Sequence, residues 1–409
     1  MEIDANWLES VLRRKSYEES PVKVVDFKHD GGLAKGDNFL SKINKIKAKV
    51  LLGNGKYKTV SFFVKNQHDS EHLKKMSVDT GIFFREITMY RDIFPKMEAL
   101  LDEAGITEDL PWGKCVDIRL YDRLILEDLS LEGYKMADRR KQLGLNASLL
   151  VMKAFGKFHG LSRILLQRGE LPLDIFRDHM STKDEDKNRF VEDGLKVLIR
   201  KCDQWGDEWK EATRRMKEAL PDFGKKFSKA LTPEPDEFSV LVHSDGWTNN
   251  LLFKYDVDPE NSTSVKLLDF QICFLSSPAR DLHMFFTTSV KLDVREKHLN
   301  TLVQAYADSL KSILTKCNYE DHIPDANEVH EMLEKRQALH FGDSFTMALV
   351  ALNDHESTPD FEEVMKKSLE AEARGEEIGD EYTLVGNMSP TAEKVIKVAI
   401  KQAMKSGVI

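Results

Sequence analysis

Side chains that could do chemistry lie in two segments, each built around a short apolar run. In LVHSDGWTNNLLF, the pattern H-x-D-x-x-x-x-N places His243, Asp245 and Asn250 on one loop, and in LLDFQ, Asp269 directly follows a second apolar run. A carboxylate can accept the proton of a hydroxyl group. An amide oxygen and a second carboxylate are the hard ligands that magnesium prefers. The pattern therefore predicts Asp245 as a general base and Asn250 and Asp269 as metal ligands.

Protein kinases carry the same succession of an H-x-D-x-x-x-x-N loop, a strand and an Asp-Phe pair. Phosphoryl transfer from ATP mainly needs a hydroxyl aligned with the γ-phosphate and cations that spread the developing charge. A base and a metal ligand on one short loop have a fixed separation, and such positioning lowers the barrier. His243 by itself is typical of a structural histidine, so we expect it to support the loop through hydrogen bonds.

Two residues further upstream complete this arrangement. Lys65 ends a strand-like segment, YKTVSFFVK, and Glu86 lies in the helix-like segment FFREITMY. Either residue alone would normally be a solvated surface charge. Because both precede Asp245 and Asp269 in the order that a kinase requires, we predict that they form an ion pair that positions the phosphates.

A glycine-rich turn and a hinge are the remaining candidates for nucleotide binding. The segment HDGGLAKG contains Gly31, Gly32 and Gly36 where a phosphate-covering loop is expected, although it does not match G-x-G-x-x-G. Glu127 and Leu129 close the last strand of the first part of the chain, where backbone groups could bind adenine. The side chains of Glu127 and Asp128 could equally be solvated.

The elements that must position these residues fall into two parts. Alternating residues predict an antiparallel sheet with one helix, a hairpin turn at Gly53-Asn54-Gly55 and a small first domain, 1–129. The second domain, 130–409, is predicted to be mainly helical, with short strands at 240–242 and 265–268. The predicted strands are 21–28, 38–52, 57–65, 111–122 and 123–129, and the predicted helices are 79–104, 146–166, 191–219, 295–314, 327–352 and 362–377. Residues 1–20 resemble an amphipathic surface helix.

With these residues in place, the chain resembles the ecdysteroid kinase-like (CHK kinase-like) family and, more distantly, choline and aminoglycoside kinases. The pieces that carry the resemblance, in order, are GDNFLSKI, VKN, FFREITMYRDIFP, LILEDLSLEGYKMADR, FGKFHGLS, VHSDGWTNNLLFKYD and LLDFQICFLSSPARDLHMFF. The resemblance implies a bilobal α+β, protein-kinase-like fold that binds ATP and Mg²⁺ and a small hydroxylated substrate. It also implies that Asp281 braces the catalytic loop. Ser244 is a departure, because related kinases usually have glycine there.

Two features separate the chain from protein kinases. SSPARD follows Asp269 so closely that there is no room for a peptide-binding activation segment, and no A-P-E motif follows. Trp247 stands where protein kinases often have lysine, and it could line the pocket or pack in the core. In the helical tail, HFGDSF offers substrate-contact candidates that could equally be core or surface residues, namely His340, Phe341, Asp343 and Phe345.

Three functions remain open from the sequence. The first is an O-kinase acting on an ecdysteroid or another lipophilic alcohol, including a xenobiotic. The second is a catalytically silent, sterol-binding pseudokinase. The third is a choline- or ethanolamine-type kinase, whose cationic substrate would need an acidic, aromatic cage.

Composition narrows the setting. The 409 residues include 60 Lys and Arg against 69 Asp and Glu, a net charge of −9, which argues against nucleic-acid binding through a general basic surface. The 4 cysteines are far apart and show no zinc or redox spacing, so we expect reduced thiols and a cytoplasmic protein. No apolar run approaches the roughly 18 residues of a membrane span. The negative charge is no obstacle to ATP, because Lys65 and magnesium would neutralise phosphate locally.

Overall fold

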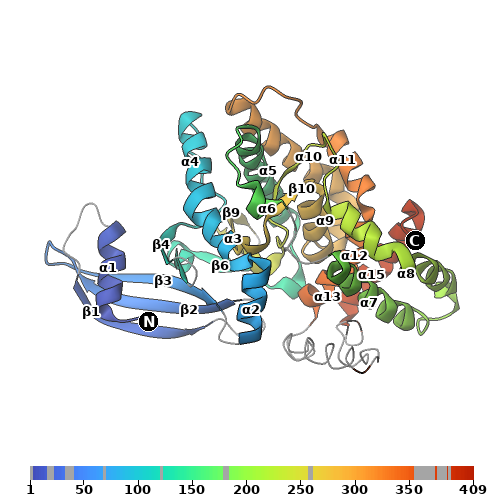
Figure 1. Cartoon of the computed structure of the whole chain (residues 1–409), viewed down its shortest axis with the longest axis horizontal. Coiled ribbons are helices and arrows are strands. Elements are labelled where there is room, and N and C mark those ends of the chain that lie inside the picture. Colours follow the sequence, from blue (N-terminus) through green and yellow to red (C-terminus); the bar gives the residue numbers. More distant parts are fainter. Residues whose placement is uncertain are drawn as a thin grey trace.

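The structure, a computed structural model, describes residues 3–15, 23–32, 41–67, 71–119, 123–177, 184–256, 261–353, 374, 385 and 388–409. Along the longest axis, a β-sheet from the first part of the chain lies at one end and a larger body of helices at the other (Figure 1). This is the bilobal α+β architecture that was expected. In the part of the chain described, no helix is both long and apolar enough to cross a membrane.

The sheet has five antiparallel strands in the order β1-β2-β3-β5-β4. Its strands are β1 Lys23–Gly32, β2 Ser41–Leu51, β3 Tyr57–Gln67, β4 Cys115–Arg119 and β5 Arg123–Glu127. The predicted hairpin turn joins β2 to β3, with Gly55 at a φ of 78°, a left-handed conformation that glycine adopts without strain. The backbone N–H of Leu52 donates to the carbonyl of Lys56 at 2.9 Å and closes the turn.

Strand β1 is longer than predicted. It continues through Gly31 and Gly32, and Gly32 pairs with Asn44 of β2. The predicted turn over 29–36 is therefore wrong for its first residues, because ladder pairing with β2 carries the strand beyond the apolar segment that suggested its end. Gly36 lies outside the described residues.

One face of the sheet is covered by helix α1, Ala5–Lys15, which confirms the predicted amphipathic helix. Leu8 of α1 is buried in a cluster with Ile46 of β2 and with Phe62 and Val64 of β3. Because side chains alternate along a strand, Lys65 of β3 points to the opposite face. The packing under α1 thus orients the lysine that was predicted to bind phosphate.

The first part of the chain contains more helix than the single one predicted. Helix α2, Glu71–Thr80, was not anticipated, and the segment 79–104 divides into α3, Ile82–Thr88, a π-helical turn, Met89–Ile93, and α4, Phe94–Glu103. Gly81 separates α2 from α3 with a φ of 67°. This left-handed residue ends one helix and lets the next begin in a new direction.

The larger body is mainly helical, with a three-stranded sheet, β6-β8-β9, and a two-stranded pair, β7 and β10. Its helices are α5 Leu145–Gln167, α6 Leu173–Phe176, α7 Asp184–Cys202, α8 Lys210–Leu231, α9 Ala279–Thr288, α10 Leu292–Lys316, α11 Ala326–Lys335, α12 Gln337–Phe345, α13 Met347–Leu352 and α15 Pro390–Ser406. Its strands are β6 Tyr134–Met136, β7 Val240–Val242, β8 Leu251–Tyr255, β9 Ser262–Leu267 and β10 Phe274–Ser276. The predicted helix 191–219 is two helices, α7 and α8, and 327–352 is three. The predicted helix 362–377 lies outside the described residues, apart from residue 374.

Helix α5 runs through the main core and packs closely on α10. A Cβ atom at Gly156 would lie 2.6 Å from the carbonyl oxygen of Tyr306, so only glycine allows this approach. Phe155 and Phe158 of α5 are fully buried in the same core. This packing fixes α5 beside strand β7, whose end leads into the segment with His243 and Asp245.

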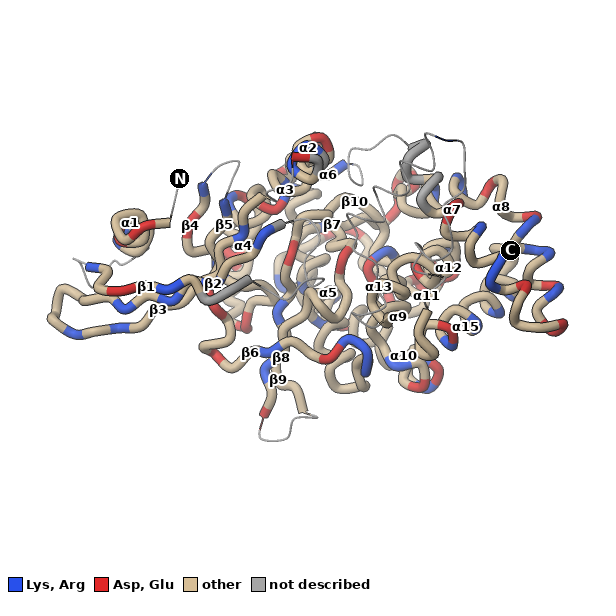
Figure 2. Tube along the Cα trace, turned by 90° about the horizontal axis from the view of Figure 1, so that it is seen from below, with Lys and Arg blue, Asp and Glu red and all other residues tan. Residues whose placement is uncertain are grey.

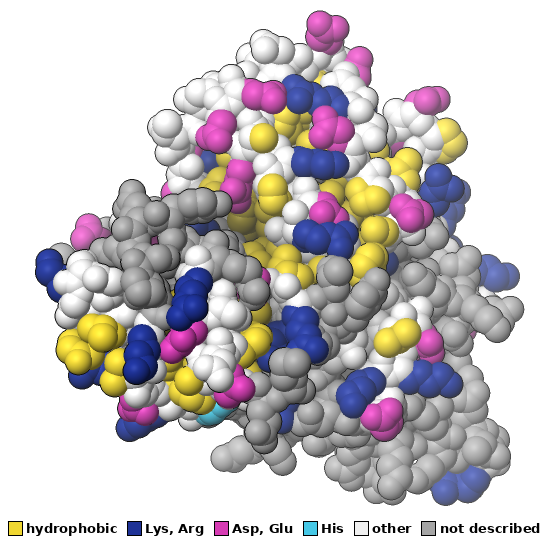
Figure 3. Space-filling model, turned by 60° about the vertical axis from the view of Figure 1, so that its left-hand side comes forward, with side chains coloured by type: hydrophobic (Ala, Val, Ile, Leu, Met, Phe, Trp, Pro, Cys, Tyr) yellow, Lys and Arg dark blue, Asp and Glu magenta, His cyan; other side chains and the backbone are white. Residues whose placement is uncertain are grey.

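Basic residues recur along the strands of the sheet. Lys45, Lys47 and Lys49 follow one another on alternate positions of β2, and Lys and Arg residues are visible along the sheet strands in Figure 2. On the face drawn in Figure 3, positive and negative side chains are interspersed. The four cysteines are free thiols, as expected.

Candidate active site

The loop after β7 brings Asp245 and Asn250 together. The chain leaves the buried strand at Val242 and makes a short helical turn, Thr248–Asn250, before β8 begins. The Asn250 amide donates to the Asp245 carbonyl at 2.8 Å and to the Asp245 carboxylate Oδ2 at 2.7 Å. Gly246 lies against Phe155 of α5, since a Cβ there would be 2.5 Å from the ring. The loop is therefore closed on itself and pressed onto the core.

Lys65, Glu86 and Asp269 meet from three separate elements. The Lys65 ammonium lies 2.7 Å from Glu86 Oε2 of α3 and 2.5 Å from Asp269 Oδ1, which follows β9. Asp269 has a left-handed backbone, with φ 67° and ψ 65°, which aspartate tolerates better than most residues. Strained backbone of this kind is concentrated at functional sites. The structure thus joins the two predicted upstream residues to one predicted metal ligand.

Burial governs the protonation of this trio. Burial alone would lower the pKa of Lys65, but the carboxylates of Asp269 and Glu86 outweigh it and raise the pKa, so Lys65 stays charged. Burial raises the pKa of Glu86 to about 7, although the Lys65 charge opposes the rise. One ammonium is therefore shared between the carboxylates of Glu86 and Asp269, and Glu86 is the more deeply buried of the two.

Asp245 is also difficult to ionise in the absence of further cations. Burial raises the pKa of its carboxyl group well above the usual range, and the nearby Asp269 carboxylate adds to the rise. The hydrogen bond from Asn250 and the charges of Arg280 and Lys65 act in the opposite direction. A base in this position gains strength from burial, and it needs positive charge nearby to be deprotonated.

Asp281 and His243 support the loop from behind, as expected. Asp281 of α9 accepts the backbone N–H of His243 at 2.7 Å and that of Ser244 at 2.6 Å. The hydrogen bond from His159 and the nearby imidazoles outweigh burial and lower the pKa of Asp281, so it is a carboxylate. His243 Nδ1 accepts the N–H of Asp245 at 3.2 Å, which leaves Nε2 to donate to the carbonyl of Leu268 at 2.9 Å. His243 thereby links the Asp245 loop to the residue before Asp269.

The hinge candidates lie at the end of β5, as predicted. The Glu127 carboxylate accepts the backbone N–H of Lys114 at 2.6 Å, and the Glu127 N–H donates to the Lys114 carbonyl. Its side chain is therefore used within the sheet. Asp128 is bound by Ser61 and by Lys45 of β2, at 2.6 Å and 2.8 Å, so it is buried and not solvated. Leu129 is buried at the start of a short helical turn, Leu129–Glu132.

The substrate-contact candidates of the helical tail prove to be core residues. Phe341 and Phe345 of α12 are at most 1% exposed and belong to an apolar cluster that also contains Trp247. Of the two interpretations of Trp247, packing is the one the structure supports. Asp343 and His340 are buried as well. These residues hold the loop and the helices together and do not line an open pocket.

Two supporting residues, His159 and Arg280, were missed by the sequence analysis. His159 of α5 bridges Asp281 at 2.9 Å and the Tyr306 hydroxyl at 2.9 Å. Arg280 of α9 forms a buried, two-pronged ion pair with Asp343, at 2.9 and 2.8 Å. A lone histidine within the apolar stripe of α5 was a usable signal for His159. Nothing local in the sequence indicates that Arg280 and Asp343 meet.

The donor set fits a divalent magnesium ion. Asn250 gives its N–H groups to Asp245, so its amide oxygen remains available as a ligand near the Asp269 carboxylate. Within the described ranges no group of three or more His, Cys, Asp or Glu side chains could hold a metal by itself. Mg²⁺ commonly takes one or two protein ligands together with substrate phosphates, which is the number that Asn250 and Asp269 would supply.

One hollow of the described surface lies away from these residues. It has a volume of about 990 Å³ and lies between α5, α10 and β9, lined among others by Lys153, Lys157 and Asp308. It contains none of the predicted site residues. The candidate active site is the place where Lys65, Asp245 and Asp269 converge, and it is separate from this hollow.

Comparison with solved structures returned several small-molecule kinases at low identity. A choline kinase from Cryptosporidium parvum Iowa II is 13% identical with a TM-score of 0.47, covering 99% of this chain and 98% of that chain. An AMP-bound spectinomycin phosphotransferase is 14% identical with a TM-score of 0.39, covering 96% and 99%. The amicoumacin kinase hAmiN is 12% identical with a TM-score of 0.37, covering 92% and 87%. A search of curated proteins found no match.

The family comparison is more specific. The model of the ecdysteroid kinase-like family matches residues 35–319. This match covers well over half of the chain and contains Lys65, Glu86, Asp245, Asn250 and Asp269. It also includes Asp281 and the hinge. The chain therefore belongs to the ecdysteroid kinase-like family.

Proposed function

We propose that this protein is an ATP- and Mg²⁺-dependent kinase that phosphorylates a hydroxyl group of a small molecule, an ecdysteroid or a similar lipophilic alcohol. One observation carries the proposal: the Lys65 ammonium joins Glu86 to Asp269, beside the loop on which Asn250 holds Asp245. In this proposal residues 1–129 form the nucleotide-binding lobe and 130–409 the catalytic and substrate-binding lobe. A cytoplasmic location goes with this function.

Residues of this chain would carry out most steps of the proposed reaction. Lys65, held by Glu86, would bind the phosphates of ATP, and Asp269 would exchange its contact with Lys65 for one with the metal. Asn250 and Asp269 would hold magnesium, whose positive charge would offset the negative charge of the phosphates. Gly31 and Gly32, with Gly36, would form part of the cover over the phosphates, and the 127–129 backbone would face adenine.

Asp245 would accept the proton of the substrate hydroxyl. Asn250 fixes the orientation of its carboxylate, since the amide donates to Oδ2 at 2.7 Å. Burial and Asp269 raise the pKa of Asp245, so bound cations that neutralise Asp269 would favour its ionised form. A base of this kind would be strong and would become available when the nucleotide complex assembles.

The family supports a lipophilic alcohol as the acceptor over choline. Its description names an ecdysteroid kinase, and a quaternary ammonium substrate would demand an acidic, aromatic cage. The convergence of Lys65, Asp245 and Asp269 also favours an active enzyme over a silent binding protein. The choline-type kinase and the silent binding protein are the two alternatives, and the experiment below distinguishes both from the proposed function.

The test is an acceptor screen. The purified protein is incubated with Mg-ATP and a panel of hydroxysteroids, xenobiotic alcohols, choline and ethanolamine, and phosphorylated products are identified by mass spectrometry alongside ADP release. We expect a phosphorylated steroid or lipophilic alcohol and an increase in melting temperature with Mg-ATP. If choline is the only acceptor that is phosphorylated, the substrate is of the choline type and not a lipophilic alcohol. Absence of both product and thermal shift would favour the silent, sterol-binding protein.

A further inference from the structure

Ser244 has a backbone conformation that a non-glycine residue rarely adopts. Its φ is 64°, in the left-handed region, and it directly precedes Asp245. Glycine occupies this region without strain, whereas serine does so only at a cost. A serine in this place must be held by its surroundings.

Two adjacent residues of α9 hold Ser244. Asp281 accepts its backbone N–H at 2.6 Å, and the Arg280 guanidinium donates through Nε to the Ser244 hydroxyl at 3.2 Å. The backbone contact to Asp281 is available to any residue at this position. The side-chain contact to Arg280 exists only because the residue is serine.

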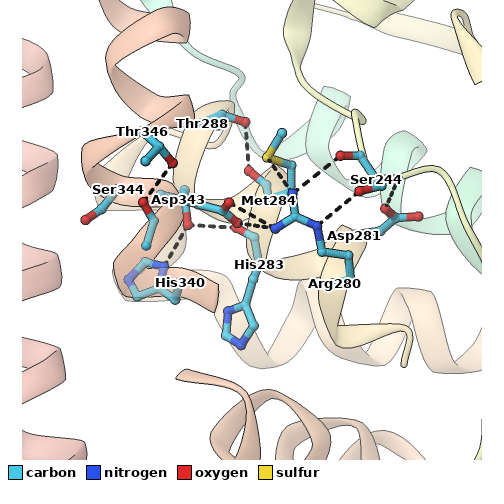
Figure 4. A network of polar contacts seen from close by, with 12 residues as sticks. Ser244, Arg280, Asp281, His283, Met284, Thr288, His340, Asp343, Ser344 and Thr346 are labelled. Atoms are coloured by element: carbon cyan, nitrogen blue, oxygen red, sulfur yellow. Dashed lines mark hydrogen bonds and ion pairs between the residues drawn. The ribbon is translucent and has the colours of Figure 1, made fainter. Parts of the chain in front are cut away.

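Arg280 is itself held by the distant helix α12. Its Nη1 donates to both carboxylate oxygens of Asp343, at 2.9 and 2.8 Å, and both side chains are almost completely buried, at 6% and 0% exposure. Figure 4 shows the guanidinium between Ser244 on one side and Asp343 on the other. Burial raises the pKa of Asp343, and the Arg280 charge opposes that rise.

The same helix holds the other side of Asp245. Trp247, two residues after Asp245, is 5% exposed and packs in the cluster that contains Phe341 and Phe345 of α12. Helix α12 is therefore linked to the loop in two ways, through the apolar cluster that it shares with Trp247 after Asp245 and through Arg280, which bonds Ser244 before it. The base lies between these two attachments.

We propose that Arg280, fixed by Asp343, is a positioning residue for the transfer step, which holds the left-handed Ser244 and thereby orients the Asp245 carboxylate. This inference rests on the proposed kinase function. The groups that face Asp245 are Asp269, Asn250, Arg280 and Lys65. Arg280 acts on Asp245 through Ser244, so its loss should leave the carboxylate less well oriented for proton transfer.

The test separates positioning from fold stability. R280M/D343L replaces the buried ion pair by apolar side chains, a change that proteins often accept without loss of stability. R336M/E237L is the matched control, because Arg336 and Glu237 form another largely buried ion pair in the same lobe, and Arg336 otherwise donates to the Ala230 carbonyl. We measure the melting temperature, KM for Mg-ATP and kcat for each variant and for the wild type.

We expect R280M/D343L to fold and to keep KM within about twofold, while kcat falls about tenfold or more. R280K, which keeps a positive charge beside Asp343, should retain more of kcat than R280M/D343L. R336M/E237L should retain the wild-type kcat. R280M/D343L with wild-type kcat would overturn the proposal.

If R280M/D343L does not fold, the variant S244A tests the role of Arg280. S244A keeps the Arg280–Asp343 pair and removes only the hydroxyl, and kcat should fall severalfold at unchanged KM. Unchanged kcat in folded S244A would then overturn the proposal. A wild-type protein that does not turn over Mg-ATP would overturn the kinase function itself. An active wild type whose variants are equally active would overturn only the role of Arg280.

Discussion

At the scale of single residues, the site depends on one cation shared between two carboxylates. Lys65 contacts both Glu86 and Asp269, and the exposed fractions of the three side chains are 3%, 1% and 14%. Removing one partner from a buried ion pair leaves an uncompensated charge. The residue that a kinase needs for phosphate binding is therefore also needed for stability in the free protein.

Removal of Lys65 should make stability depend on pH. Burial already raises the pKa of Glu86 beside Lys65, and in K65M the rise would be larger. A carboxyl group whose pKa is raised by folding favours the folded state at low pH and loses this advantage as pH increases. We expect K65M to lose about 3–5 kcal/mol of unfolding free energy at pH 8 and less at pH 5, measured by urea denaturation.

The control for this effect is E86Q in the K65M background. Glutamine keeps the shape of Glu86 without an ionisable group, so K65M/E86Q should recover stability at pH 8 and lose most of the pH dependence. A K65M protein whose stability does not change between pH 5 and pH 8 would show that the Glu86 carboxyl is not the source.

Predictability from the sequence differed among the site residues. Asp245, Asn250 and Asp269 were predictable because a strand followed by a short polar loop is visible locally. Arg280 and Asp343 were not, because each appears as an ordinary charge and only the folded chain brings them together. Asp343 was a candidate for substrate contact. In the structure it is buried and holds the Arg280 guanidinium.

At the scale of elements, the close contact of α5 with α10 supports the site through His159. A Cβ at Gly156 would lie 2.6 Å from the Tyr306 carbonyl and 2.7 Å from Ser309 Cβ. G156A should therefore lower the unfolding free energy by about 1–3 kcal/mol, although alanine favours helix. G144A is the matched control, since nothing lies within 4 Å of its Cβ position, and it should change stability by only a few tenths of a kcal/mol. Equal stability of the two variants in chemical denaturation would contradict this packing.

Two buried histidines connect four helices behind the site. His283 of α9 donates to the Leu333 carbonyl of α11 at 2.9 Å. His340 of α12 bonds Thr287 of α9 at 2.7 Å and Gln402 of α15 at 2.8 Å. Burial lowers the pKa of His283 to about 4, assisted by Arg280, Arg336 and Arg295. Burial also lowers the pKa of His340 well below its usual value, with help from Arg295 and His283.

These histidines should make the protein sensitive to mild acid. The unfolded chain takes up a proton on His283 near pH 6.5, whereas the folded protein does so only near pH 4, so stability falls as pH falls through this window. From pH 7.5 to pH 5 we expect a loss of about 2 kcal/mol from His283. Urea denaturation of H283Q and wild type measures it, and the same acid-induced loss in H283Q would contradict the assignment.

Strands and hairpins were predicted better than helix ends. Alternation and the Gly53-Asn54-Gly55 turn identified β2 and β3, because both signals are local. The helix predicted over 327–352 is interrupted at Arg336 and Thr346. The apolar pattern continues through these breaks. The sequence therefore does not show where each helix ends, because the ends depend on packing between distant parts of the chain.

At the scale of the whole molecule, the sheet and the helical body meet through the proposed reaction site. Lys65 comes from the sheet, and Asp245, Asn250 and Asp269 come from the helical body. The structure places the Lys65 ammonium of the sheet against the Asp269 carboxylate of the helical body, and the proposed function uses both residues on the nucleotide phosphates.

The most direct test of the central claim is the rate of ADP release by D245N at saturating Mg-ATP and acceptor. D308N is the control, since Asp308 is an exposed aspartate of α10. We predict that D245N retains the melting-temperature increase with Mg-ATP while its rate falls about 10²–10⁴-fold, and that D308N matches the wild type. A D245N protein that binds Mg-ATP and turns over at the wild-type rate would contradict the assignment of Asp245 as the base.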